Sequence, residues 1–232
     1  MKSKPFPPGR PDSLDDAGEI RRNDWAAFSS LSRMENHWEV KPWPPGASSF
    51  YWYLTFGHDD SLASTARACQ DALGSFPLRP VAVETLHMTL LKVGGVDAVE
   101  GAGLERVVEK AGIALQSVSR FELAVGPLAG SAGAIRFSVS PWSPVLDLVE
   151  RLGAAQESEP GLGPVKSVEN MRPHVGIAYS AARQPVAPIL DRITDLRELA
   201  PVTTSVKDVK LVRLWRTESA YEWEEKATIF LM

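Results

Sequence analysis

Two short apolar runs with a histidine stand out in the pattern of hydrophobic and polar positions. The first is Leu-His-Met-Thr-Leu around His87, and the second is Pro-His-Val-Gly-Ile around His174. Because successive side chains of a strand point to opposite faces, His87 shares a face with Thr89, and His174 shares one with Gly176. Apolar neighbours fill the other faces, so each run predicts a half-buried strand.

Helical and strand patterns alternate along the rest of the chain. We expect helices at 24–35, 61–73, 97–118, 143–152 and 188–199, and strands at 49–57, 83–93, 121–125, 134–140, 206–215 and 222–231. Each histidine strand is followed by a helix and then by a pair of strands. This order predicts an α+β fold with two similar lobes and antiparallel or mixed sheets.

The composition changes along the chain and suggests three parts. Residues 1–22 are rich in proline, glycine and charge, and we expect a flexible arm. In residues 23–48, Asn23 is a plausible N-cap for the first helix, and a stretch with three prolines and two tryptophans (38–46) should lack regular structure. This extension should pack on the single bilobal domain formed by residues 49–232.

The charge and the cysteine count restrict the possible functions. A net charge of −4 argues against an extended surface for duplex nucleic acid, but it allows a nucleotide or an RNA end in a local pocket. The single cysteine, Cys69, excludes an intrachain disulfide and a cysteine-rich zinc site. No apolar run approaches the roughly 20 residues of a membrane span, and the N-terminus lacks the apolar core of a signal peptide. We expect a cytoplasmic monomer that does not bind membranes.

The side chains of the two histidine strands suggest acid–base chemistry. An imidazole can take or give a proton near neutral pH, and a hydroxyl can donate to a phosphoryl oxygen. Two such strands that face each other would supply a base, an acid and donors for oxyanions. This set suits attack at phosphorus and predicts a site that needs no metal and no cofactor.

With these two motifs the sequence resembles the 2H phosphoesterase superfamily, which includes 2′-5′ RNA ligase-like and cyclic phosphodiesterase proteins. The resemblance covers roughly residues 49–232, and it implies a duplicated fold with two sheets facing a central cleft and helices outside. It also implies a metal-independent reaction at 2′,3′-cyclic phosphates or 2′-5′ linkages of nucleotides or RNA ends. His87 and His174 would be the acid–base pair, and Thr89 would hold a phosphoryl oxygen.

One position departs from the pattern of the family. Gly176 stands where the family places serine or threonine, so the phosphate would lose one hydroxyl at this position. A single oxyanion donor can contribute about 10²–10³ in rate. An alternative function therefore remains, in which the same cleft binds a nucleotide or an RNA end with weak or no catalysis.

Weaker candidates surround the two motifs. Arg172 alternates onto the face of His174 and could bind phosphate, as could Arg213 or Arg216 from the last hairpin. Tyr51 or Tyr53 could stack on a base.

Four other side chains are expected to lie outside the site. Strict alternation places Lys92 and Tyr179 on the faces opposite the motif histidines. His37 and His58 lie in loop contexts and have no partner pattern.

Overall fold

The computed structural model describes residues 9–99, 101–157, 159, 162 and 168–232. The strands are β1 (Arg33–Met34), β2 (Ser48–Thr55), β3 (Leu78–Pro80), β4 (His87–Gly95), β5 (Phe121–Ser131), β6 (Ala134–Ser140), β7 (His174–Ser180), β8 (Gln184–Pro185), β9 (Val202–Val206), β10 (Asp208–Arg216) and β11 (Tyr221–Phe230). The helices are α1 (Ala17–Ser29), α2 (His37–Val40), α3 (Asp60–Ala72), α4 (Val96–Val99), α5 (Ala102–Leu115), α6 (Ser143–Glu157) and α7 (Ala187–Leu196), with short 3₁₀ turns η1 (Val83–Thr85) and η2 (Val168–Asn170).

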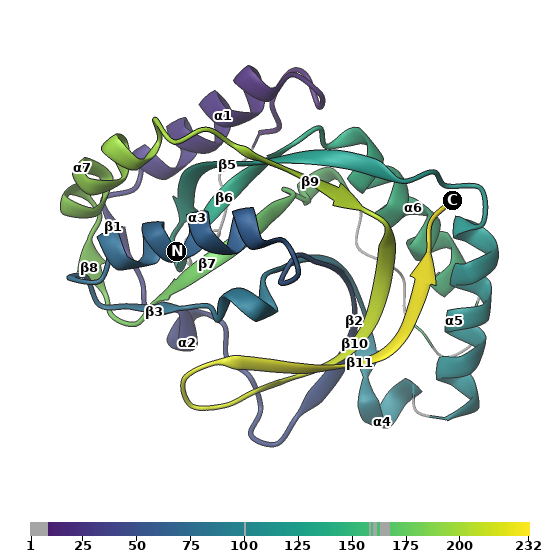
Figure 1. Ribbon diagram of the computed structural model, residues 1–232. Coiled ribbons are helices and arrows are strands. Elements are labelled where there is room, and N and C mark those ends of the chain that lie inside the picture. The colour runs from purple at the N-terminus through teal and green to yellow at the C-terminus, as the bar shows by residue number, and fades with distance from the viewer. Residues whose placement is uncertain (1–8, 100, 158, 160–161, 163–167) are drawn as a thin grey trace.

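Two antiparallel sheets form the centre of the fold, with helices on the outside (Figure 1). One sheet has the strand order β11-β10-β2-β4, and the other has the order β3-β7-β6-β5-β9. All the pairings within them are antiparallel. The structure confirms the expected α+β fold with two lobes, in which β4 carries the first histidine and β7 carries the second.

The two lobes exchange their strand pairs. The β5–β6 hairpin follows β4 in the chain but pairs with β7, while the β10–β11 hairpin follows β7 but joins β2 and β4. The sheet with the first histidine strand, β4, therefore contains the hairpin that follows β7 in the chain. The sheet with the second histidine strand, β7, contains the hairpin that follows β4. This exchange links the two halves of the site through their sheets.

Several boundaries differ from the expected ones. The first helix begins at Ala17, capped by the Asp16 side chain, and not at Asp24, so residues 17–22 of the expected arm are helical. Residues 1–8 of that arm lie outside the described residues. The proline-rich stretch expected to be irregular begins with the helical turn α2, whose cap is Asn36.

Three further elements differ from the expected ones in continuity or length. The helix expected at 97–118 is interrupted at Gly101, whose φ of 73° favours glycine and separates α4 from α5. The strand expected at 206–215 is also two strands, because the chain leaves one sheet at Val206 and enters the other at Asp208. Strand β5 runs to Ser131, well beyond the expected end at residue 125.

Helix α1 packs on β5 and β6, over the sheet that carries His174 (Figure 1). The contact is close, because a Cβ on Gly130 would lie 2.4 Å from the ring of Phe28. Phe28 is fully buried in the main core, as is Cys69 on α3. Burial raises the pKa of the Cys69 thiol to about 11, so this thiol stays protonated at neutral pH.

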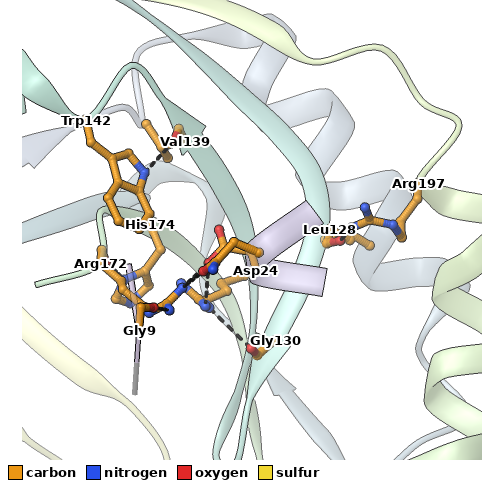
Figure 2. A network of polar contacts seen from close by, with 11 residues as sticks. Gly9, Asp24, Leu128, Gly130, Val139, Trp142, Arg172, His174 and Arg197 are labelled. Atoms are coloured by element: carbon orange, nitrogen blue, oxygen red, sulfur yellow. Dashed lines mark hydrogen bonds and ion pairs between the residues drawn. The ribbon is translucent and has the colours of Figure 1, made fainter. Parts of the chain in front are cut away.

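Helix α1 also brings a carboxylate into the interior. Asp24 is fully buried and forms ion pairs of 3.2 Å with both Arg136 of β6 and Arg172 (Figure 2). Arg136 is itself fully buried, and Arg172 is 6% exposed. Arg172 also donates to the side-chain oxygen of Asn23 at 2.6 Å. The single carboxylate of Asp24 thus pairs with two buried guanidinium groups beside the second histidine motif and offsets one of their two positive charges.

We predict that Asp24→Asn lowers the free energy of unfolding by about 3–5 kcal/mol, because it leaves buried guanidinium groups without their anion. Urea unfolding measures the loss. Asp191→Asn, a matched change on the exposed surface of α7, should alter stability by less than about 0.5 kcal/mol. Equal stabilities of the two variants would contradict the proposed role of Asp24.

Candidate active site

The two motif histidines lie at the starts of their strands, in equivalent surroundings. His87 follows the turn η1 and opens β4, and His174 opens β7 shortly after η2. Both side chains are half-buried, while the apolar residues that follow them are buried. The sequence pattern predicted this alternation.

Each histidine ring is held by the backbone carbonyl two residues before it. Nδ1 of His87 lies 2.8 Å from the oxygen of Thr85, and Nδ1 of His174 lies 2.7 Å from the oxygen of Arg172. A carbonyl can only accept, so Nδ1 is the protonated nitrogen in both rings. In the neutral imidazole the acceptor nitrogen is then Nε2, the one that can take a proton from a ligand.

Both histidines line one cavity of about 990 Å³ between the two sheets. Thr89 and Gly176, the second residues of the two motifs, line the same cavity. The two rings are close enough for the charge of one to affect the other, since His87 contributes to the lowered pKa of His174. The structure thus brings together the four motif positions expected to form the site.

A β-bulge in each histidine strand adds a further residue to this cavity. On β4, Trp52 pairs with Leu91 and Tyr53 pairs with Thr89, so the pairing passes over the residue between them. The side chain of Lys92 therefore turns to the cavity. The expectation that Lys92 faces away is wrong, because the bulge breaks the strict alternation of the strand.

The same irregularity recurs on β7. Gly176 pairs with Arg136 and Ala178 pairs with Ile135, so one residue of β7 is passed over here as well. Tyr179 consequently lines the cavity, against expectation. The sequence signal for both bulges is a pair of consecutive apolar residues three and four positions after each histidine.

Tyr53 lies parallel to the first histidine. The two rings stack with centroids 4.2 Å apart and an interplanar angle of 5°, and Tyr53 is 2% exposed. Tyr53 is paired with Thr89 across the two strands. Burial raises the pKa of the Tyr53 phenol, which therefore keeps its proton. The Thr89 hydroxyl lines the same cavity, where it can donate to a ligand.

Gly176 leaves open space on the other side of the cavity. A Cβ built on it would meet no heavy atom within 4 Å. No neighbouring backbone therefore requires glycine at this position. Its absent side chain leaves room beside His174.

Burial favours the neutral form of both motif histidines. Burial, followed by the charge of Arg136, lowers the pKa of His174 to about 3. Burial also lowers the pKa of His87, against the opposing hydrogen bond to Thr85. A bound phosphate would oppose these effects, because a nearby negative charge favours the imidazolium.

Comparison with known proteins agrees with this geometry. The family model described as the 2′-5′ RNA ligase superfamily matches residues 59–218, which include both histidine motifs. The chain belongs to the 2′-5′ RNA ligase superfamily. This membership confirms the expected 2H phosphoesterase relationship, and a comparison with curated proteins finds no match.

Solved structures support the fold assignment. Escherichia coli LigT in its apo form aligns with a TM-score of 0.57 and 15% identity, over 80% of this chain and 98% of LigT. TT0787 of Thermus thermophilus aligns with a TM-score of 0.57 and 16% identity, over 79% of this chain and 97% of TT0787. The complex of E. coli LigT with 3′-AMP aligns with a TM-score of 0.55 and 15% identity, over 80% and 98%.

A third histidine lies in the cavity wall, outside the segment matched by the superfamily model. His37 of α2 is 4% exposed, and its Nε2 lies 3.1 Å from the hydroxyl of Tyr221. Its ring packs against Tyr179 and Tyr221, with centroids 4.4 and 5.6 Å away. Sequence reasoning missed this residue, because its partners are distant in the chain and it belongs to no motif.

Two of the expected phosphate ligands have partners within the protein. Arg172 lines the cavity, but its guanidinium is bound by Asp24 and Asn23 and also donates to the carbonyl of Gly9, and its role in binding phosphate stays a prediction. Arg216 donates to the carbonyl of Lys41 at 2.8 Å and is absent from the described residues that line the cavity. Its contact with phosphate stays a prediction.

The remaining candidates are Arg213 and two tyrosines, Tyr51 and Tyr53. Arg213 lines the cavity and also pairs with Glu224 at 3.7 Å. Tyr53 lines the cavity, one face of its ring is covered by His87, and its stacking on a base stays a prediction. Tyr51 lines the cavity beneath the ammonium of Lys92, which lies 5.9 Å from the ring centre, and its stacking on a base stays a prediction.

Further findings concern the remaining expectations. No helix among the described residues is long and apolar enough to cross a membrane. In the same part of the chain, no three side chains of His, Cys, Asp or Glu gather as metal ligands would. His58 is exposed, as its loop context suggested.

We predict that the stability of the protein rises with pH between about 4 and 6.5, partly because of His37. Burial, followed by the charge of Lys41, lowers the pKa of His37 from 6.5 to about 3. Between these values the unfolded chain binds more protons than the folded one, so raising the pH favours folding. One such group contributes up to about 1.4 kcal/mol per pH unit.

Urea unfolding at several pH values tests this prediction. His37→Asn should flatten the rise between pH 4 and 6, whereas the matched variant His58→Asn should keep the slope of the wild type. An unchanged slope in His37→Asn would show that His37 is not held neutral by the fold.

Proposed function

We propose that this protein is a metal-independent phosphoesterase that acts on 2′,3′-cyclic phosphates or 2′-5′ linkages of nucleotides or RNA ends. The observation that carries the proposal is the equivalent placement of His87 and His174, which line one cavity with their Nδ1 protons bound to carbonyls. Membership in the superfamily supports a phosphoesterase, and one of the solved LigT structures is a complex with 3′-AMP.

The two histidines have different electrostatic surroundings, which suggest different roles. His174 lies near the positive charges of Arg136 and Lys41, both of which oppose its protonation after the larger effect of burial. For His87, burial lowers the pKa and the hydrogen bond to the Thr85 carbonyl opposes this effect. We assign His174 as the general base. We assign His87 as the general acid, because the negative charge of a bound phosphate can more easily favour its protonated form.

Hydrolysis of a cyclic phosphate then proceeds in one displacement. Nε2 of His174 takes a proton from water as the water oxygen attacks phosphorus. The bond from phosphorus to one ribose oxygen breaks, and Nε2 of protonated His87 gives its proton to that oxygen. The product is a nucleoside monophosphate, and the Thr89 hydroxyl donates to a non-bridging oxygen during the step.

We predict that His87→Ala and His174→Ala each reduce turnover of 2′,3′-cyclic AMP by at least about 10²-fold. A second substrate, thymidine p-nitrophenyl phosphate, separates their roles because nitrophenolate leaves without a proton. His87→Ala should lose much less activity on this substrate, and His174→Ala should lose activity on both. His58→Ala is the matched control and should retain turnover of the wild type.

Steady-state assays in excess EDTA measure these effects, with melting temperatures to confirm folding. A folded His87→Ala or His174→Ala variant with full turnover of cyclic AMP would remove that histidine from the mechanism. Loss of wild-type activity in EDTA, with recovery on adding a divalent ion, would contradict metal independence.

Gly176 favours one alternative, a module that binds a nucleotide or an RNA end without turnover. It lacks the hydroxyl that would be the counterpart of Thr89, and the space beside it is open. Wild-type protein that binds 3′-AMP but does not hydrolyse cyclic AMP would favour this alternative.

A further inference from the structure

The two halves of the site differ in what they offer to a phosphate. In the first half, Thr89 presents a hydroxyl beside His87. In the second half, Gly176 presents none, and a Cβ there would meet no heavy atom within 4 Å. Phosphate oxygens on this side therefore need a donor from another part of the chain.

Lys41 lines the same cavity, but it belongs to neither histidine strand. It follows α2, in the segment before β2, and this segment lies outside residues 59–218 that match the superfamily. Lys41 is an exposed residue that a ligand can reach, and the protein around it lowers the pKa of its ammonium through desolvation. Its charge also reaches the second histidine, since it contributes, after burial and Arg136, to the lowered pKa of His174.

The backbone that carries Lys41 is fixed from two sides. The Lys41 N–H donates to the carbonyl of His37 at 3.1 Å, which closes α2. The Arg216 guanidinium donates to the carbonyl of Lys41 at 2.8 Å and also to that of Trp38 at 3.4 Å. Trp38 packs edge-on against Tyr179 at 5.4 Å. The ammonium of Lys41 is thus attached to a backbone that is anchored to both sheets.

The other cations of the cavity contact neighbouring side chains. Arg172 pairs with Asp24 at 3.2 Å and Arg213 with Glu224 at 3.7 Å, whereas the ammonium of Lys92 lies over the ring of Tyr51 and, like Lys41, belongs to no ion pair of the described residues. None of the ion pairs formed by the described residues includes Lys41. Its charge has no carboxylate to neutralise it, as expected for a group that binds an anionic ligand.

We propose that Lys41 binds the phosphate of the substrate on the side of Gly176, in place of the missing hydroxyl of the second motif. This inference rests on the proposed function for its ligand, a nucleotide phosphate. It also explains how a site with glycine at position 176 can hold the oxygens of the phosphate from both sides.

A binding experiment tests Lys41 independently of turnover. Isothermal titration compares 3′-AMP with adenosine, which lacks the phosphate, for wild type, Lys41→Gln, Lys41→Arg and Lys41→Gln/Gly176→Thr. Lys41→Gln should weaken binding of 3′-AMP by about ten- to a hundredfold, as expected for a lost hydrogen bond to a charged oxygen, and leave adenosine binding unchanged. Lys41→Arg should keep most of the affinity.

The double variant and a surface control complete the test. Gly176→Thr adds a hydroxyl in the open space, so it should recover part of the affinity that Lys41→Gln loses. Lys207→Gln, at an exposed lysine between β9 and β10, should bind like the wild type.

The possible results separate this inference from the proposed function. Wild-type affinity of Lys41→Gln for 3′-AMP, or an equal loss for adenosine, would overturn the role of Lys41 even if cyclic AMP is hydrolysed. A selective loss of 3′-AMP binding would support it even if turnover is absent, in which case only the proposed catalysis fails. A wild type that does not bind 3′-AMP would overturn both.

Discussion

The hydrogen bond from each motif histidine to the carbonyl two residues before it sets the chemistry of the whole site. It fixes the tautomer, so that Nδ1 carries the proton and Nε2 is the nitrogen that can exchange a proton with a ligand. It also fixes the ring against its own backbone. Because both histidines use the same device at the start of a strand, one local geometry supplies both proton-transfer groups.

The segments that precede the superfamily match contribute to the second half of this site. Asp24 of α1 holds the guanidinium of Arg172, whose carbonyl in turn holds His174. The segment after α2 adds His37 and Lys41 to the cavity wall. Both histidines are therefore supported by chain that precedes the matched residues: the second by α1 and the segment after α2, and the first by Tyr53 of β2.

Sequence reasoning found the elements that depend on local pattern. The two histidine strands and the α+β class follow from alternation and element order, and the structure confirms them. The predicted orientations of Lys92 and Tyr179 are wrong, because a bulge in each strand shifts the alternation of side chains by one residue. The pairs of apolar residues after each motif are the local signal of this shift.

Contacts between distant segments could not be predicted from one sequence. The exchange of hairpins between the sheets, the burial of Asp24 between two arginines and the contact of His37 with Tyr221 all join residues that are far apart in the chain. The local sequence around a charged residue such as Arg172 does not show whether its side chain binds a ligand or a buried carboxylate. Only the fold distinguishes these two roles.

Nitrogen-15 NMR of the histidine rings tests the central claim, that both motif histidines present an unprotonated Nε2 to one cleft. At pH 7 the account predicts a protonated Nδ1 and an unprotonated Nε2 for His87 and His174, and a shift of both Nε2 signals on adding 3′-AMP. A protonated Nε2 in either neutral ring, or a ring that does not respond to 3′-AMP while the other does, would contradict it.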